Sequence, residues 1–209
     1  MGSGRTSTNA RTIAAYEAGA DAYRQAEAAH DPPALSAFLR AFATQMQPGT
    51  EVLEFGSATG RDAAALEEHG VCVHRTDATT AFVSRLRAQG FSAEVLNVLT
   101  DELGGPWRAM YAGAVFLHFD EAEFSHVLAR TAAATVPGGL LAFTLKEGDG
   151  AHWTTAKLGR PRHFTYWREP SVRALIGRSR WEVTAIQHAP GHREAWLECL
   201  CRLPGAASS

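Results

Sequence analysis

An alternation of short apolar runs with helix-like segments follows Pro48-Gly49 and constrains the fold of this 209-residue chain more than any other feature. The apolar runs are predicted strands, and the segments between them are predicted helices. The strands are expected at 51–55, 71–76, 92–96, 109–117 and 140–145, and the helices at 61–69, 79–89, 121–135 and 170–178. Repeated strand–helix units fold into a mainly parallel sheet with helices on both faces. The sequence therefore predicts a doubly wound α/β fold, in which ligands bind beyond the carboxyl ends of the strands.

The segments on either side of this pattern have a different character. Residues 10–29 carry apolar side chains at helical spacing, and Asp31 before two prolines is expected to begin a second helix. Near the other end, 181–188 and 194–202 alternate around Pro190-Gly191 and predict an antiparallel hairpin. The sheet is therefore expected to carry an antiparallel strand at or near one edge.

These patterns divide the chain into three predicted parts. A helical lid covers 1–48, an α/β domain covers 49–203, and a flexible tail covers 204–209. Within the domain, a turn is predicted at 137–139, and the polar, aromatic-containing stretch 147–168 is expected to be an insertion on the substrate side.

Charge and cysteine content narrow the partners and the compartment. The net charge of −2 gives no electrostatic footprint for nucleic acid or for an anionic membrane, and no apolar run approaches the ~18 residues of a membrane span. Cys72, Cys199 and Cys201 lack zinc-site spacing, and the last two are expected to be buried thiols on one strand face. We therefore expect a cytoplasmic monomer or homodimer without a metal, a nucleic-acid partner or a membrane partner.

Small residues recur at Gly56, Ala58 and Gly60, directly after the first predicted strand. Such residues let the backbone turn sharply and approach a ligand closely, and the following helix presents free N–H groups. The spacing differs from the Gly-x-Gly-x-x-Gly of a dinucleotide site. The loop predicts a ligand-binding turn, and a purely structural turn is the alternative.

Polar side chains also end the second and third predicted strands. The Asp77 carboxylate is placed to accept both hydroxyls of a ribose, and a helix N-cap for 79–89 is its alternative role. The Asn97 amide is able to read an adenine edge, or it forms a turn. Together with the loop, these residues predict an adenosine-containing ligand.

The ordered set of motifs resembles the class I S-adenosylmethionine-dependent methyltransferases over roughly residues 10–203. The segment 52–62 is similar to the cofactor loop of that family, Asp77 falls at its ribose-binding acid, and 136–141 is similar to the turn before its fifth strand. The segments 145–148 and 162–167 and the closing Trp196-Leu197 resemble a small bacterial subgroup of tellurite-resistance-like methyltransferases.

The resemblance implies a Rossmann-like, seven-stranded sheet, mostly parallel with one antiparallel strand, and S-adenosylmethionine as cofactor. It implies that Gly56, Ala58 and Gly60 lie against the methionine moiety and that Glu54 reaches its amino end. Tyr16 is expected to close over the methyl group from the lid, and Arg61 to hold the carboxylate. The sequence departs from the family at Ala58, where a glycine is usual, and at Asn97, where an aspartate is common.

The acceptor is expected to be a small molecule methylated on oxygen or nitrogen, and the arginine- and alanine-rich composition makes bacterial specialised metabolism a reasonable context. Methyl transfer requires alignment, and a base only for a weakly acidic hydroxyl or amine. His118 is the candidate base, with a structural histidine as the alternative, and Lys146 is the candidate anchor for a substrate carboxylate, with a surface lysine as the alternative. Arg162, His163 and Tyr166 suit an aromatic or carboxylated acceptor.

Two other functions remain open at this point. A third departure from the family is Met110 in the fourth predicted strand, where an acidic residue is often found. The departures at Ala58, Asn97 and Met110 are compatible with a non-catalytic member that binds the cofactor in a regulatory or structural role. A nicotinamide-dependent oxidoreductase is a third hypothesis, against which the glycine spacing and the helical lid argue.

Overall fold

The computed structural model describes residues 7–28, 37–191 and 194–205 and centres on a seven-stranded sheet. The strand order is β3-β2-β1-β4-β5-β9-β8, and only β9 runs antiparallel to its neighbours. The strands are β1 (Glu51–Phe55), β2 (Cys72–Asp77), β3 (Ala93–Val95), β4 (Trp107–Ala112), β5 (Thr135–Lys146), β8 (Glu182–Pro190) and β9 (Ala195–Arg202). The predicted doubly wound sheet with one antiparallel strand is confirmed.

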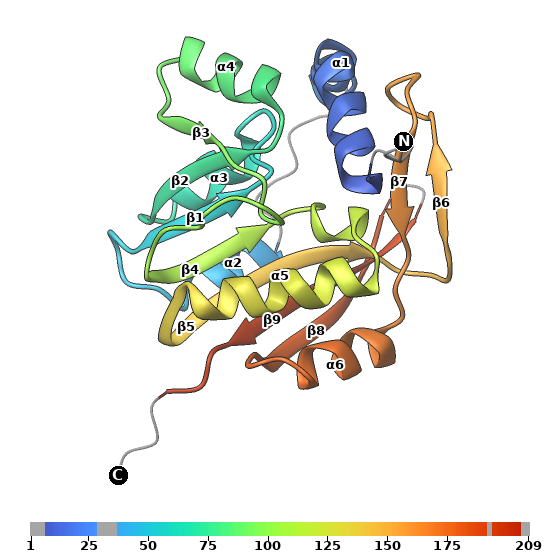
Figure 1. Ribbon diagram of the computed structural model, residues 1–209. Helices are drawn as coiled ribbons and strands as arrows, with labels where there is room; N and C mark the ends of the chain where they lie inside the picture. The colour runs from blue at the N-terminus through green and yellow to red at the C-terminus, as the bar shows by residue number, and fades with distance from the viewer. Residues whose placement is uncertain (1–6, 29–36, 192–193, 206–209) are drawn as a thin grey trace, which may run out of the picture.

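Six α-helices lie around this sheet in the described residues (Figure 1). They are α1 (Thr8–Ala28), α2 (Ala37–Ala43), α3 (Arg61–Glu67), α4 (Thr80–Ala88), α5 (Glu121–Ala133) and α6 (Glu169–Gly177). The predicted helix start at Asp31 lies outside the described residues, as do parts of the predicted lid and tail. The division into lid, domain and tail stays a prediction.

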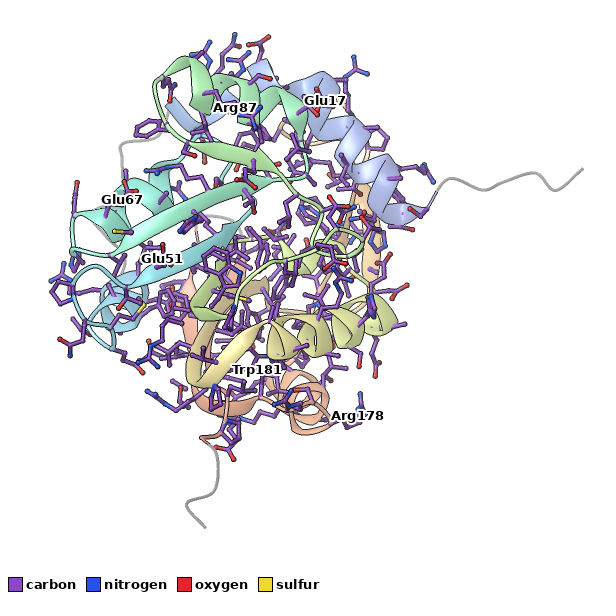
Figure 2. All side chains as sticks on the ribbon, turned by 60° about the vertical axis from the view of Figure 1, so that its left-hand side comes forward. Glu17, Glu51, Glu67, Arg87, Arg178 and Trp181 are labelled. Atoms are coloured by element: carbon purple, nitrogen blue, oxygen red, sulfur yellow. The ribbon has the colours of Figure 1, made fainter. Side chains whose placement is uncertain are left out.

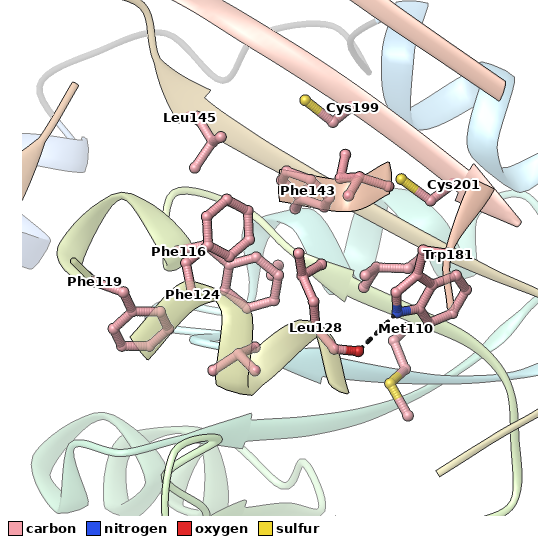
Figure 3. Packing of buried hydrophobic residues seen from close by; sticks show 14 of the residues in the cluster. Met110, Phe116, Phe119, Phe124, Leu128, Phe143, Leu145, Trp181, Cys199 and Cys201 are labelled. Carbon is pink, nitrogen blue, oxygen red and sulfur yellow. Dashed lines mark hydrogen bonds between the residues drawn. The ribbon is translucent and has the colours of Figure 1, made fainter. Parts of the chain in front are cut away.

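The face of the sheet covered by α5 and α6 holds the larger apolar core (Figure 3). The rings of Phe116, Phe124 and Phe143 lie 5.4–5.5 Å apart. The indole Nε1 of Trp181 donates to the Leu128 carbonyl at 3.1 Å, which satisfies its only donor inside the core. Cys199 and Cys201 of β9 point to this face and are fully buried, as predicted.

The opposite face is covered by α2 and α3. Phe38, Leu39 and Phe42 of α2 pack against buried side chains that include Tyr111 of β4 and Leu200 of β9.

At the edge of the molecule an ion pair joins α6 to α5. Figure 2 shows Arg178 at this edge, and its guanidinium donates to Glu121 at 2.7 Å. Among the described helices, none is both long and apolar enough to cross a bilayer.

The predicted end of the fourth strand, at residue 117, is wrong. The strand stops at Ala112, and 113–115 turn the chain, with Ala114 at a φ of +56°, before a 3-10 helix forms at Phe116–His118 (η1). The apolar run continues through this turn because Phe116, Leu117 and Phe119 enter the core from it. The turn brings His118 back towards the middle of the sheet edge.

The turn predicted at 137–139 lies inside β5. Trp107 pairs with Thr135, but Ala109 pairs with Leu140, so β5 holds three more residues than β4 between these two pairs. The additional residues form a bulge in which Gly138 takes a φ of +78°. The prolyl and glycyl residues therefore interrupt the ladder without ending the strand.

The predicted insertion contains a hairpin that the sequence analysis did not identify. Strands β6 (Ala151–Thr154) and β7 (Arg162–Thr165) pair antiparallel as a separate two-stranded sheet. This hairpin lies beside α1 above the sheet edge (Figure 1), and α1 also contacts α4. The lid helix thus bridges the hairpin and the helix that follows β2.

Candidate functional site

The loop after β1 adopts the tight turn that its small residues permit. Gly56 and Gly60 have φ angles of +69° and +83°, and the Gly60 N–H donates to the Ser57 carbonyl at 2.7 Å. A Cβ at position 56 would lie 2.4 Å from Cγ2 of Val115. Only glycine fits position 56, because both the backbone angle and the packing exclude a side chain.

Ala58 occupies the left-handed region as well, with a φ of +48°. We expect Ala58→Gly to raise the free energy of unfolding by about 0.5–1 kcal/mol, since the strain of a left-handed alanine exceeds the entropy that glycine adds to the unfolded chain. Urea denaturation measures this difference. Ala64→Gly, at an exposed position inside α3, is the matched control and should destabilise by about 1 kcal/mol. A loss of stability in Ala58→Gly would contradict strain at this position.

Asp77 links the end of β2 to this loop. Its Oδ2 accepts from the Ala58 N–H at 3.0 Å, and its Oδ1 accepts from the Thr79 N–H at 2.8 Å. Thr79, and not Asp77, is the N-cap residue of α4. Burial raises the pKa of the Asp77 carboxyl, and these backbone hydrogen bonds oppose that shift. Each carboxylate oxygen keeps lone-pair capacity for a further donor.

Glu54 is a buried carboxyl at the end of β1. Its Oε2 accepts from the Ser57 hydroxyl, and its side chain is 2 % exposed. Burial raises the pKa of Glu54 to about 8, against the opposing hydrogen bond from Ser57. Glu54 is therefore mostly protonated and neutral at pH 7.

Arg61 begins α3 at the edge of the loop and is half exposed. Its guanidinium lies 2.9 Å from Asp62 and 3.6 Å from Glu27 of the lid helix. Glu27 also accepts from the Thr59 hydroxyl at 2.6 Å. The charge of Arg61 is thus shared between the lid and the loop.

A chain of hydrogen bonds joins three predicted site residues from distant parts of the sequence. Arg162 Nη1 donates to the Tyr16 hydroxyl at 3.1 Å, and that hydroxyl lies 3.0 Å from His118 Nε2. His118 Nδ1 lies 2.6 Å from the His163 carbonyl, which is only an acceptor. His118 therefore carries its proton on Nδ1, and its Nε2 lone pair accepts the Tyr16 proton.

Burial sets the protonation states of the three hydrogen-bonded side chains Arg162, Tyr16 and His118. His118 is 8 % exposed, and burial lowers its pKa to about 3, with Arg162 and Lys146 contributing in the same direction. Burial raises the pKa of Tyr16, and Arg162 counteracts part of that shift. At neutral pH the arrangement is a neutral tyrosine and a neutral imidazole beside one arginine.

The remaining predicted residues lie farther from the loop. Lys146 pairs with Glu194 at 2.5 Å and lies 4.0 Å from the Phe164 ring centroid, and Tyr166 donates to the same Glu194 at 2.7 Å. The His163 side chain points away from the Tyr16–His118 chain, because residues alternate along β7 and Arg162 and Phe164 take the inner face.

The side-chain amide of Asn97 hydrogen-bonds to other residues of the protein. Nδ2 donates to Asn9 of α1 at 2.9 Å, and Oδ1 accepts from the Leu99 N–H at 3.1 Å. The turn-forming role is therefore present, and the contact to Asn9 also anchors the lid helix to the end of β3.

A cavity of about 320 Å³ opens beside the glycine loop on the α2 side of the sheet. It extends from Glu54, Asp62 and the lid residue Tyr23 to the ends of β5 and β9. We call it the loop cavity. Sequence reasoning missed Tyr111, whose hydroxyl donates to Asp62 at 2.9 Å beneath this cavity. Tyr23 was detectable, since it lies seven residues after Tyr16 on the same helix face.

Metal binding finds no support in the described residues. No group of three or more histidine, cysteine, aspartate or glutamate side chains is placed to hold an ion in residues 7–28, 37–191 and 194–205.

Three solved structures are similar to this chain over most of its length. A Burkholderia thailandensis 1,6-didemethyltoxoflavin-N1-methyltransferase with bound S-adenosylhomocysteine matches with a TM-score of 0.73 and 16% identity, covering 98% of this chain and 93% of that one. A glycopeptide N-methyltransferase with sinefungin matches with a TM-score of 0.64 and 14% identity, covering 82% of this chain and 87% of that one. The Synechocystis PCC 6803 magnesium protoporphyrin IX methyltransferase with S-adenosylmethionine matches with a TM-score of 0.62 and 14% identity, covering 96% of this chain and 86% of that one.

These likenesses establish the fold. The chain has the Rossmann-like fold of S-adenosylmethionine-dependent methyltransferases. No protein-family model and no curated protein sequence matches it.

Proposed function

We propose that the chain is an S-adenosylmethionine-dependent methyltransferase that acts on oxygen or nitrogen of a small molecule. The observation that carries the proposal is the buried Asp77 carboxylate, which ends β2 and hydrogen-bonds to the loop after β1. In a doubly wound sheet this is the crevice in which nucleotide ligands bind. Asp77 then binds the ribose hydroxyls, and the loop residues Gly56, Ala58 and Gly60 border the methionyl group.

The donor set fits this cofactor. The loop cavity presents the Asp62 carboxylate for an ammonium group, the neutral Glu54 carboxyl as a hydrogen-bond acceptor for the same group, and Arg61 for a carboxylate. Tyr23 in the same cavity offers an aromatic surface, which attracts cations. Bound S-adenosylmethionine supplies an electrophilic methyl group on a sulfonium that leaves as a neutral thioether. The protein therefore needs no acid to expel the leaving group.

The Arg162–Tyr16–His118 chain is our proposal for the proton acceptor. A hydroxyl or amine acceptor transfers its proton to the Tyr16 oxygen while Tyr16 passes its own proton to Nε2 of His118. The resulting imidazolium keeps its Nδ1–H bond to the His163 carbonyl, and Tyr16 ends the step as a neutral phenol that still accepts from Arg162. The hydrogen-bonded chain gains one positive charge in this step, which equals the charge that a sulfonium donor loses on becoming a neutral thioether.

Lys146, Arg162 and Tyr166 are proposed to form the side that binds the methyl acceptor, and His163 contributes to it through its backbone carbonyl, which binds His118. Lys146 and Tyr166 both bind Glu194, so together they fix the start of β9 beside the hairpin. A small-molecule acceptor from bacterial specialised metabolism is supported by the names of similar structures, which specify a toxoflavin precursor and a glycopeptide.

Calorimetric titration with S-adenosylhomocysteine tests the cofactor assignment. The wild-type protein should bind it, and Asp77→Ala should bind at least about tenfold more weakly, because two charge-assisted hydrogen bonds to the ribose are lost. Asp149→Ala removes an exposed carboxylate that pairs only with Arg168 in the described structure, and it should bind like the wild type. Absence of binding to the wild type, or equal binding to Asp77→Ala, refutes the proposal.

A non-catalytic cofactor-binding role is the second candidate. It is supported by the departures from the family pattern at Ala58, Asn97 and Met110. Binding of S-adenosylhomocysteine without methyl transfer across a broad acceptor screen would favour this role over catalysis.

A further inference from the structure

The far end of the loop cavity is formed by one face of β9. Residues alternate along a strand, so Trp196 and Glu198 share a face while Leu197 and Cys199 enter the core on the other. Trp196, Glu198 and the neighbouring Thr144 of β5 line the cavity. An aromatic ring and a carboxylate therefore lie side by side at the end remote from the glycine loop.

Glu198 differs from the other carboxyl groups of the cavity. Glu54 is bonded to Ser57, Glu27 to Thr59, and Asp62 to Tyr111. The Glu198 carboxylate has no hydrogen-bond or ion-pair partner among residues 7–28, 37–191 and 194–205, and burial alone raises its pKa. Its oxygens are open to the cavity and therefore free to accept from a charged donor on a ligand.

The positive groups near this end are already paired. Lys146 lies next to Trp196 in the β5–β9 register, but its ammonium binds Glu194. Arg61 is shared by Glu27 and Asp62 at the opposite end of the cavity. The unbalanced charge at the β9 end is therefore negative.

Trp196 is held in a fixed position. A Cβ at Gly191 would lie 2.5 Å from the indole Nε1, so the hairpin backbone packs directly against the ring edge. The ring is half-buried, and one part of it borders the cavity. A rigid indole of this kind presents a flat surface for stacking.

We propose that Trp196 and Glu198 form an acceptor subsite for an aromatic molecule that carries an ammonium group. The ring of the acceptor stacks on Trp196, and the ammonium pairs with Glu198. This inference rests on the proposed methyltransferase function and narrows its acceptor from any small molecule to an arylalkylamine, whose amino group is charged at neutral pH.

The test uses two amines and their uncharged counterparts, titrated into the full chain with saturating S-adenosylhomocysteine. The pairs are tryptamine with tryptophol and 2-phenylethylamine with 2-phenylethanol. The wild type should bind each amine at least about tenfold more tightly than its alcohol, since a charge-assisted pair replaces a neutral hydrogen bond. Glu198→Gln should reduce this ratio to about one, and Trp196→Leu should weaken amine and alcohol alike.

Glu182→Gln, at an exposed glutamate that begins β8, is the matched control and should keep the preference. Equal affinity for amine and alcohol in the wild type, no amine binding, or an unchanged ratio in Glu198→Gln overturns the subsite. If S-adenosylhomocysteine itself does not bind, the proposed function fails as well. Cofactor binding without amine preference refutes the subsite alone.

Discussion

Glu54→Gln is expected to raise the free energy of unfolding at pH 7 by about 3 kcal/mol. Burial raises the pKa of Glu54 to about 8 in the folded protein, whereas the unfolded chain ionises near the ordinary value of 4.5. Between these values the folded state holds a proton that the unfolded state releases. Stability therefore falls by about 1.4 kcal/mol for each pH unit from 4.5 to 8. Glutamine stays neutral in both states and removes this slope.

Urea denaturation of the wild type and Glu54→Gln at pH 5, 6, 7 and 8 measures the effect. The difference between the two proteins should increase steadily across this series. Glu94→Gln, at an exposed position of β3, should parallel the wild type throughout. A pH-independent difference would mean that Glu54 is ionised in the folded protein. Because Glu54 lines the loop cavity, we also expect the variant to bind S-adenosylhomocysteine more weakly despite its greater stability.

His118→Gln is expected to protect the fold against acid. Burial lowers the pKa of His118 to about 3, so between about 3 and 6.5 the unfolded chain binds a proton that the folded chain excludes. The contribution to stability is complete above pH 6.5 and is lost as the pH falls, which amounts to about 2 kcal/mol at pH 5. A glutamine amide can still donate to the His163 carbonyl and accept from Tyr16, but it does not titrate.

Acid titration followed by circular dichroism compares the two proteins. The unfolding midpoint of His118→Gln should lie at a lower pH, while His126→Gln, at an exposed position of α5, should unfold like the wild type. Coincident acid transitions would show that His118 is accessible to protons in the folded state. The same variant should retain S-adenosylhomocysteine binding and lose turnover, because it cannot accept the Tyr16 proton.

The titrations of Glu54 and His118 change the free energy of unfolding in opposite directions, and the pH ranges over which they do so overlap. Between about pH 4.5 and 6.5 the loss from one carboxyl and the gain from one imidazole nearly cancel. With these two groups alone the wild type should show a flat stability maximum there. Glu54→Gln should instead gain stability up to about pH 6.5 and stay level above it, and His118→Gln should stay level below about pH 4.5 and lose stability above it.

The order of strands and helices was predictable because each buried strand is a distinct apolar run bounded by glycine or polar residues. The end of β4 was not, since Phe116, Leu117 and Phe119 are apolar whether they extend a strand or enter the core from a 3-10 turn. The hairpin β6–β7 was missed because its strands are only four residues long and partly polar.

The candidate site was predictable where function depends on local sequence. Gly56 and Asp77 follow directly from their places after β1 and β2. The Arg162–Tyr16–His118 chain joins residues more than 100 positions apart, and no local pattern encodes such a contact. Alternation along β9 identified Cys199 and Cys201 as buried. The sequence does not show which other β9 residues border a cavity, because this depends on how α2 and the glycine loop pack against the other face of the sheet.

The position of β9 between β5 and β8 also affects the order in which the sheet can assemble during translation. In the described structure β8 pairs with β9 alone, so β8 is synthesised before the strand that joins it to the sheet. Until 195–202 have been synthesised, β5 presents an unpaired edge of hydrophobic residues, and such edges invite pairing with other chains. The nascent chain is therefore most exposed to aggregation just before β9 inserts, and a chaperone that shields β5 would act in that interval.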